Sequence, residues 1–167
     1  MADKNILIQK LVMAMNIDSL NRSFVHTAEI ENGMVFQADG RSTDADKAEV
    51  FKVKAPAAGA LNNLWMAYEP EVVITTSGNS EYKGLDPDVR NFAIKAGRVF
   101  SGFKPQKHDI ITLTGGAVLA GTKGTNTFIN ATADAMTLTW GATQTASAFS
   151  AQLLETTYVS ITDDLLS

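Results

Sequence analysis

The alternation of apolar and polar residues predicts a protein built mainly of short β-strands. Between residues 22 and 161, apolar side chains recur at every second position in short stretches separated by glycine, proline, asparagine or aspartate. Such alternation places the apolar side chains on one face of a strand. About ten such stretches at fairly regular spacing predict a mostly β fold, a single β-sandwich or barrel-like domain.

The first residues follow a different pattern. Within ILIQKLVMAM (residues 6–15), apolar residues fall at helical spacing and predict a short helix or an extended N-terminal arm. We therefore divide the chain into an arm, residues 1–18, and a β domain, residues 19–167. The arm lacks an obvious local partner, so we expect it to form an interface with another protein or subunit through Leu7, Ile8, Leu11 and Met15. The alternative, that the arm packs on its own domain, stays open.

Two local signals refine the β domain. Asn32-Gly33 lies between two alternating stretches, which predicts a β-hairpin. Gly97 and Gly102 interrupt an apolar stretch and predict a bulge or kink in a strand.

The chain changes in composition near residue 110. Residues 110–162 contain thirteen threonines and only three charged residues, which are Lys123, Asp134 and Glu155. Threonine favours strands and keeps a sheet face polar without charge. Residues 110–167 are thus either a Thr/Ala-rich subdomain or part of one continuous β fold whose weakly charged face contacts another protein.

Overall composition excludes several classes of protein. The 167 residues are enough for one domain with its own core. A net charge of −4 argues against nucleic-acid binding, and no apolar run is long enough to span a membrane. Without cysteine, thiolate metal sites and cysteine nucleophiles are absent. We expect a soluble chain without a signal peptide, made in the cytoplasm.

The glycine-rich stretch GGAVLAGTKGT (residues 115–125) raises the question of a phosphate-binding loop. Such a loop requires lysine directly after its second glycine, followed by Ser or Thr and a helix. Here Thr122 occupies the lysine position, Gly124 follows Lys123, and the next residues alternate like a strand. The stretch therefore predicts a turn between strands and no nucleotide cofactor.

Other candidate chemistry is sparse. His108-Asp109 with Glu69 or Asp86 could form an acid–base group, yet no nucleophile motif accompanies it. His26 on a strand is interpreted as a partly buried residue. Asp39, Asp44 and Asp46 match a calcium-binding loop only weakly. Glu69 and Glu71 match the carboxylate pair of a glycosidase only weakly. The sequence predicts no enzymatic activity, no metal and no cofactor.

A cluster of basic residues stands out in this acidic chain. No acidic residue occurs between residues 95 and 108, a segment that contains Lys95, Arg98, Lys104 and Lys107. The cluster could contact an acidic protein surface or could be an ordinary solvated face.

Three stretches together resemble the auxiliary head proteins of tailed bacteriophages. They are SLNRSFVHTAEIENGMVFQ, EVFKVKAPAAGALNNLWMAYEPEV and FAIKAGRVFSGFKPQKHDIITLT, which lie within residues 19–114. The Thr/Ala-rich residues after 125 depart from the resemblance.

The resemblance implies a decoration or cement protein on the capsid exterior, without enzymatic activity, that binds the major capsid protein as a trimer or dimer. Alternatives are a tail or neck component of the virion, a carbohydrate-binding module that stacks sugars on Trp65, Tyr68 or Trp140, and, least favoured, a small hydrolase.

Overall fold

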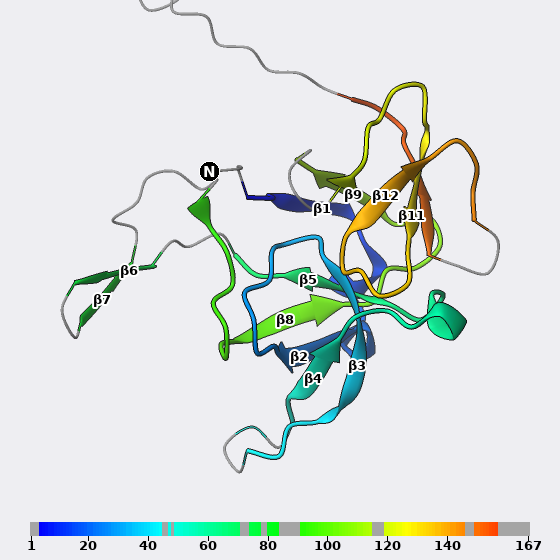
Figure 1. The fold of residues 1–167 in the computed structure, drawn as a ribbon. Coiled ribbons are helices and arrows are strands. Elements are labelled where there is room, and N and C mark those ends of the chain that lie inside the picture. Colours follow the sequence, from blue (N-terminus) through cyan, green and yellow to red (C-terminus); the bar gives the residue numbers. More distant parts are fainter. Residues whose placement is uncertain are drawn as a thin grey trace, which may run out of the picture.

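The computed structural model describes residues 4–44, 47, 49–70, 74–77, 80–83, 91–114, 119–145 and 149–156. Its elements are short strands and single 3-10 turns, which confirms the predicted mostly β, barrel-like fold (Figure 1). The 3-10 turns are η1 (Met13–Met15), η2 (Asp18–Leu20) and η4 (Ala58–Ala60).

The centre of the molecule is a closed barrel with the strand order β2-β4-β3-β5-β8. All neighbours in it are antiparallel except β2 and β4, which are parallel. The barrel strands are β2 (Asn21–Val25), β3 (Val35–Arg41), β4 (Phe51–Lys54), β5 (Trp65–Tyr68) and β8 (Val99–Phe103).

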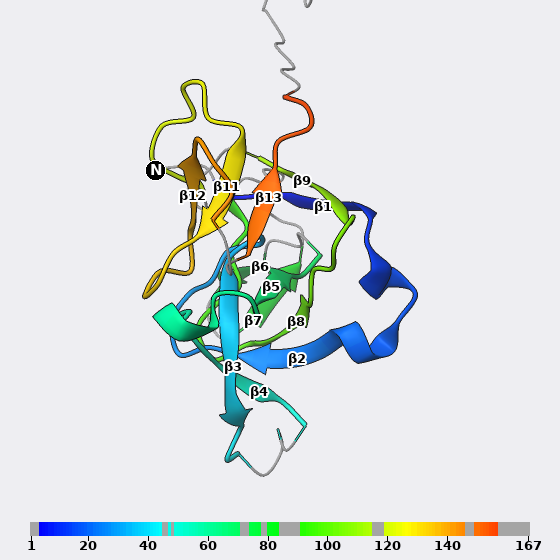
Figure 2. The same cartoon turned by 90° about the vertical axis from the view of Figure 1, so that its right-hand side faces the viewer.

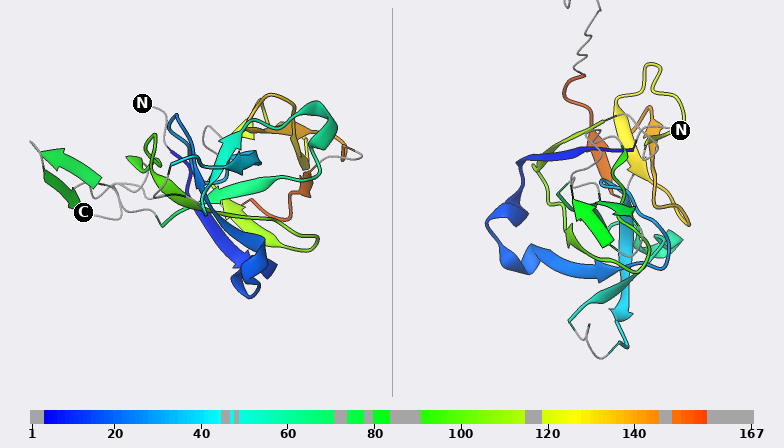
Figure 3. Two further views of the ribbon diagram at one scale, coloured as in Figure 1. Left: turned by 90° about the horizontal axis from the view of Figure 1, so that it is seen from below. Right: turned by 90° about the vertical axis from the view of Figure 1, so that its left-hand side faces the viewer.

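A second sheet with the order β10-β12-β11-β13 lies beyond one end of the barrel (Figures 1 to 3). Its strands are β10 (Leu119–Ala120), β11 (Phe128–Ala131), β12 (Leu138–Gly141) and β13 (Ser150–Gln152). Next to it, β1 (Leu7–Leu11) pairs antiparallel with β9 (Ile110–Leu113). A further pair, β6 (Ile74–Ser77) with β7 (Ser80–Lys83), is also antiparallel.

Where β3 and β5 pair with each other, both strands are buried on both faces, and neighbouring residues belong to two different cores. Phe36 and Ala67 point into an aromatic cluster, whereas the adjacent Val35 and Met66 join a second cluster. The aromatic cluster consists of Phe24, Ile30, Phe36, Ala67, Phe92, Ile94 and Phe100. The second cluster joins barrel, second sheet and N-terminal segment through Leu7, Val12, Ala14, Val35, Leu64, Met66, Phe103, Ala131 and Leu138. Residues after 110 therefore share a core with the barrel.

Because Gly102 has no side chain, two phenyl rings can pack closely against it in the aromatic cluster. A Cβ atom at this position would lie 2.7 Å from the ring of Phe24 and 3.0 Å from that of Phe36. Phe24 and Phe36 themselves meet edge to face with 4.8 Å between ring centroids. Gly102 is thus required for close packing and marks neither bulge nor kink, whereas Gly97 has a positive φ of 75° in a turn before β8.

The predicted hairpin at Asn32-Gly33 is wrong. The two residues do form a turn, in which Gly33 has a φ of 85°. The flanking strands β2 and β3, however, each pair with other strands. The turn is fixed instead to the end of β5, because the Asn32 side chain both donates to the Glu69 carbonyl oxygen (2.8 Å) and accepts from the Glu69 N–H (2.9 Å).

Candidate interaction surface

The N-terminal segment, which is β1 followed by η1, exchanges its inward and outward faces partway along. Asn5 and Leu7 are buried at its start, but Val12 and Ala14 are buried further on. The register between β1 and β9 shifts between Gln9 and Leu11. An extra residue in one strand sends every following side chain to the opposite face. Odd-numbered residues point inward before the shift and outward after it.

This reversal gathers exposed apolar side chains in one short segment. Seven large apolar side chains are exposed in the part of the chain that the structure describes, and five of them lie between residues 8 and 17. We call these five the apolar ledge: Ile8 (56% exposed), Leu11 (67%), Met13 (46%), Met15 (61%) and Ile17 (39%). They follow the dark-blue segment from β1 to β2 on the right of Figure 2. A concentration of exposed apolar side chains in one segment makes it a candidate interaction site.

The backbone beneath the ledge is fixed by hydrogen bonds. The Met13 N–H donates to Oδ1 of Asp109 (3.0 Å), and the Asn21 side chain donates to the carbonyl oxygens of Ala14 (2.6 Å) and Ile17 (3.3 Å). The Lys104 N–H donates to the carbonyl oxygen that ends η2 (2.8 Å). A surface ordered before its partner arrives loses less conformational entropy on binding.

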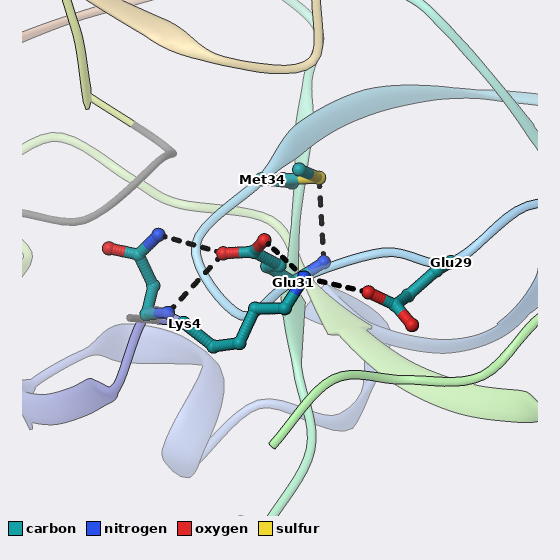
Figure 4. A network of polar contacts seen from close by, with 5 residues as sticks. Lys4, Glu29, Glu31 and Met34 are labelled. Atoms are coloured by element: carbon teal, nitrogen blue, oxygen red, sulfur yellow. Dashed lines mark hydrogen bonds and ion pairs between the residues drawn. The ribbon is translucent and has the colours of Figure 1, made fainter. Parts of the chain in front are cut away.

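An ionic network attaches the first described residues to the segment that precedes β3 (Figure 4). Nζ of Lys4 lies 2.7 Å from Oε1 of Glu29 and 3.1 Å from Oε1 of Glu31. Oε2 of Glu31, which is 6% exposed, accepts hydrogen bonds from the backbone and side chain of Asn5 (3.3 and 3.1 Å). The hydrogen bond to Glu29, with those to Glu31, raises the pKa of Lys4 against the opposing effect of desolvation.

The arm residues predicted for an interface divide into two groups. Ile8, Leu11 and Met15 lie on the ledge, whereas Leu7 is 2% exposed and packs in the core. The expectation that this segment lacks a local partner is therefore wrong, because Val12 and Ala14 are buried beside Leu7 in the same cluster. Met13 and Ile17 were missed, because residues 11–15 are all apolar and no alternation in the sequence separates the exposed side chains from the buried ones.

The predicted basic residues do not form one compact patch. Lys104 and Lys107 belong to the turn after β8, which contacts the ledge through the hydrogen bond between Asp109 and Met13. Lys95 and Arg98 precede β8. Since a strand rises about 3.3 Å per residue, the five residues of β8 separate the two pairs. Only Lys104 and Lys107 adjoin the apolar ledge.

The candidate acid–base residues have structural partners. Oδ1 of Asp109 accepts from the Met13 N–H, and Oδ2 accepts from the Gln106 N–H (2.8 Å). Oε2 of Glu69 accepts from the Ser101 N–H (3.1 Å). His26 is half-buried and its Nδ1 lies 3.0 Å from the Ala28 carbonyl oxygen. Both Asp86 and Glu71 lie outside the described residues.

The proposed calcium ligands are paired with lysines. Asp39 lies 3.0 Å from Nζ of Lys54, and Asp44 lies 3.4 Å from Nζ of Lys47, while Asp46 is outside the described residues. Across the described ranges, no three His, Asp or Glu side chains gather as metal ligands would.

Residues 121–127 join β10 to β11. Residues 115–118 are outside the described part, but Gly121 and Gly124 adopt positive φ and the next element is β11. Nζ of Lys123 donates to Oγ1 of Thr156 (2.8 Å).

Two of the three aromatic residues considered for sugar stacking, Trp65 and Tyr68, pack against the interior. Trp65 lies 5.1 Å from Phe24 between ring centroids, and Tyr68 lies 6.5 Å from Phe103. They lie on opposite faces of β5 and contact different clusters, and half-buried Trp140 is on β12. They do not form a shared platform.

No helix within the described ranges is long and apolar enough to cross a membrane. No family model, curated protein or solved structure gives a significant match to the chain.

Proposed function

We propose that this protein is a structural virion protein of a tailed bacteriophage, which binds the major capsid protein on the outside of the head and stabilises the shell as a decoration protein. The apolar ledge is the observation that carries this proposal. The resemblance within residues 19–114 supports it, and the ledge supplies a preordered apolar surface with Lys104 and Lys107 beside it.

Burial of the apolar ledge would contribute the binding free energy expected of one contact in a capsid lattice. Complete burial of a large apolar side chain contributes roughly 1.5–3 kcal/mol, and the five ledge residues are already partly covered. Loss of translational and rotational freedom offsets much of that gain for one copy. An oligomer that presents two or three ledges to a symmetric shell binds far more tightly than one copy, because its later contacts are intramolecular.

Co-sedimentation with shells tests the proposal. The probe is empty shells assembled from a major capsid protein encoded in the same genome as this chain. The double variant Leu11→Ser, Met15→Ser should keep the wild-type melting temperature, because both side chains are exposed, and should no longer pellet with shells. The matched control Val99→Ser changes an exposed apolar residue on the barrel and should pellet like the wild type.

Two results would contradict the proposal. If the wild-type chain does not pellet with shells, the decoration function is wrong, and pelleting with tails instead would support a tail component. If the double variant binds shells as well as Val99→Ser does, the ledge is not the contact surface.

A further inference from the structure

A groove of about 610 Å³ separates the turn before β9 from the edge of the second sheet. Residues 105–111 form one wall, residues 149–152 and Leu154 form the other, and Phe128 and Gln144 complete the lining. Its volume falls in the range of roughly 300–1,000 Å³ that is typical of ligand-binding clefts.

The groove borders the open edge of β13. Side chains of successive strand residues point to opposite faces, yet four consecutive residues, 149–152, all line the groove. The Phe149 carbonyl oxygen accepts from Ala131, and the Leu153 N–H donates to Thr127. Backbone groups alternate in direction along an antiparallel strand, so those of Ser150 and Gln152 face away from β11 and toward the groove.

An added strand is the occupant that such an edge favours, because it pairs with the outward N–H and C=O groups. The chain itself contains a suitable segment. Residues 157–164, TYVSITDD, lie beyond the described residues and combine the strand formers Tyr158, Val159 and Ile161 with two terminal aspartates. Lys107 lines the groove and complements the negative charge of these aspartates, and the two oxygens of Asp109, which also lines it, accept from the N–H groups of Met13 and Gln106.

The last described residues are held against the second sheet, away from a return to their own groove. β13 ends at Gln152, and Thr156 is bonded to Lys123 in the loop between β10 and β11. To enter its own groove the chain would have to reverse direction at once. Residues 155–162, ETTYVSIT, contain no glycine, proline, asparagine or aspartate with which to make a tight turn.

We propose that residues 157–164 of one copy occupy the groove of a second copy and extend its sheet at the open edge of β13. This self-association does not depend on binding to a capsid, and its test uses the chain alone.

Two full-length variants separate the donor from the acceptor. Val159→Pro with Ile161→Pro disables the donor segment, because proline cannot donate to a strand ladder. Gln152→Pro removes one N–H that faces the groove, and proline is tolerated on an edge strand. The matched controls Val159→Ile with Ile161→Val, and Gln152→Ala, keep every backbone N–H.

Light scattering coupled to size exclusion gives the readout. The wild type and both controls should form oligomers of the 17.9 kDa chain, and each proline variant alone should be monomeric. An equal mixture of the two proline variants should form a one-to-one dimer, because one intact groove then meets one intact donor segment. A synthetic peptide of residues 155–167 should dissociate the wild-type oligomer.

If Gln152→Pro does not fold, variants with reversed charges in the groove and in the donor segment test the same contact. Lys107→Glu should weaken self-association at least tenfold, and Asp163→Lys with Asp164→Lys on the other chain should restore it. A wild-type chain that is monomeric at every concentration tested overturns the proposal. So does an oligomer that the donor prolines leave intact, or a mixture of proline variants that stays monomeric.

Discussion

Nζ of Lys4 lies 3.1 Å from Oε1 of the buried Glu31, and this pair fastens the start of the described chain to the turn before β3. The other carboxylate oxygen of Glu31 is held by Asn5. A buried carboxylate requires such partners, because desolvation of an unpaired charge is strongly unfavourable. The N-terminal segment and the barrel are therefore joined by charge as well as by the apolar core.

Removal of the lysine charge should destabilise the fold. Lys4→Met leaves Glu31 without its cation, and we expect the free energy of unfolding to fall by about 1–3 kcal/mol. The control Glu29→Gln changes the exposed partner of the same lysine and should cost less than about 1 kcal/mol. Urea unfolding at neutral pH measures both. Equal losses in the two variants would show that burial of Glu31 is not what makes the pair important.

The same pair predicts a pH dependence at alkaline pH. The hydrogen bonds to Glu29 and Glu31 raise the pKa of Lys4 above its ordinary value of 10.5. Because the folded pKa is the higher one, the stabilisation is fully present below pH 10.5 and is lost as pH rises through the folded pKa. The stability difference between the wild type and Lys4→Met should therefore shrink above pH 10.5. A difference that grows there would contradict the assignment.

Adjacent residues of β1 should respond very differently to truncation. Leu7 is 2% exposed and Ile8 is 56% exposed, so Leu7→Ala should cost about 2–5 kcal/mol and Ile8→Ala less than about 0.5 kcal/mol. Denaturant titration of the two variants tests the register of β1. Similar losses in both would be the signature of a helix with both residues on one buried side.

The alternation of residues was sufficient to predict a β fold but not the partners of each strand. Asn32-Gly33 has the local chemistry of a hairpin turn, and the turn is present. Its flanking strands pair elsewhere because β2 completes the barrel with β8, where Phe24 lies opposite Phe100. Such long-range pairing is selected by the burial of the aromatic cluster, which a local pattern does not encode.

The N-terminal segment shows why part of the apolar ledge was not predicted from the sequence. Ile8, Leu11 and Met15 have the i, i+3, i+7 spacing of a helix face. In the structure Ile8 and Leu11 lie on β1, whose register shifts between Gln9 and Leu11, and Met15 lies in η1. Met13 and Ile17 are exposed as well, although neither falls on that helix face. The groove could not be anticipated at all, because its walls come from segments about forty residues apart.

Gly102 should be the least replaceable glycine of the barrel. A methyl group there would overlap the Phe24 ring at 2.7 Å, and we expect Gly102→Ala to cost about 1–3 kcal/mol through overpacking. At Gly59, in η4, a Cβ meets no atom within 4 Å. The control Gly59→Ala should be neutral or stabilise by up to about 1 kcal/mol, because it restricts the unfolded chain. Thermal unfolding compares the two, and a Gly102→Ala protein as stable as Gly59→Ala would show that Phe24 can move aside.

Asp109 should hold the backbone beneath the apolar ledge in a fixed conformation. Its two oxygens accept from the N–H groups of Met13 and Gln106, and asparagine can offer only one carbonyl oxygen. Asp109→Asn should therefore accelerate hydrogen exchange at one of these two amides, and Asp109→Ala should accelerate both. A bond to a charged acceptor contributes about 1.5–3 kcal/mol, so local protection should fall at least tenfold while the barrel amides stay protected. Asp39→Asn, which alters an exposed pair with Lys54, is the matched control and should leave both amides unchanged. If Met13 and Gln106 remain protected in Asp109→Ala, the ledge is held by Val12 and Ala14 in the core rather than by this carboxylate.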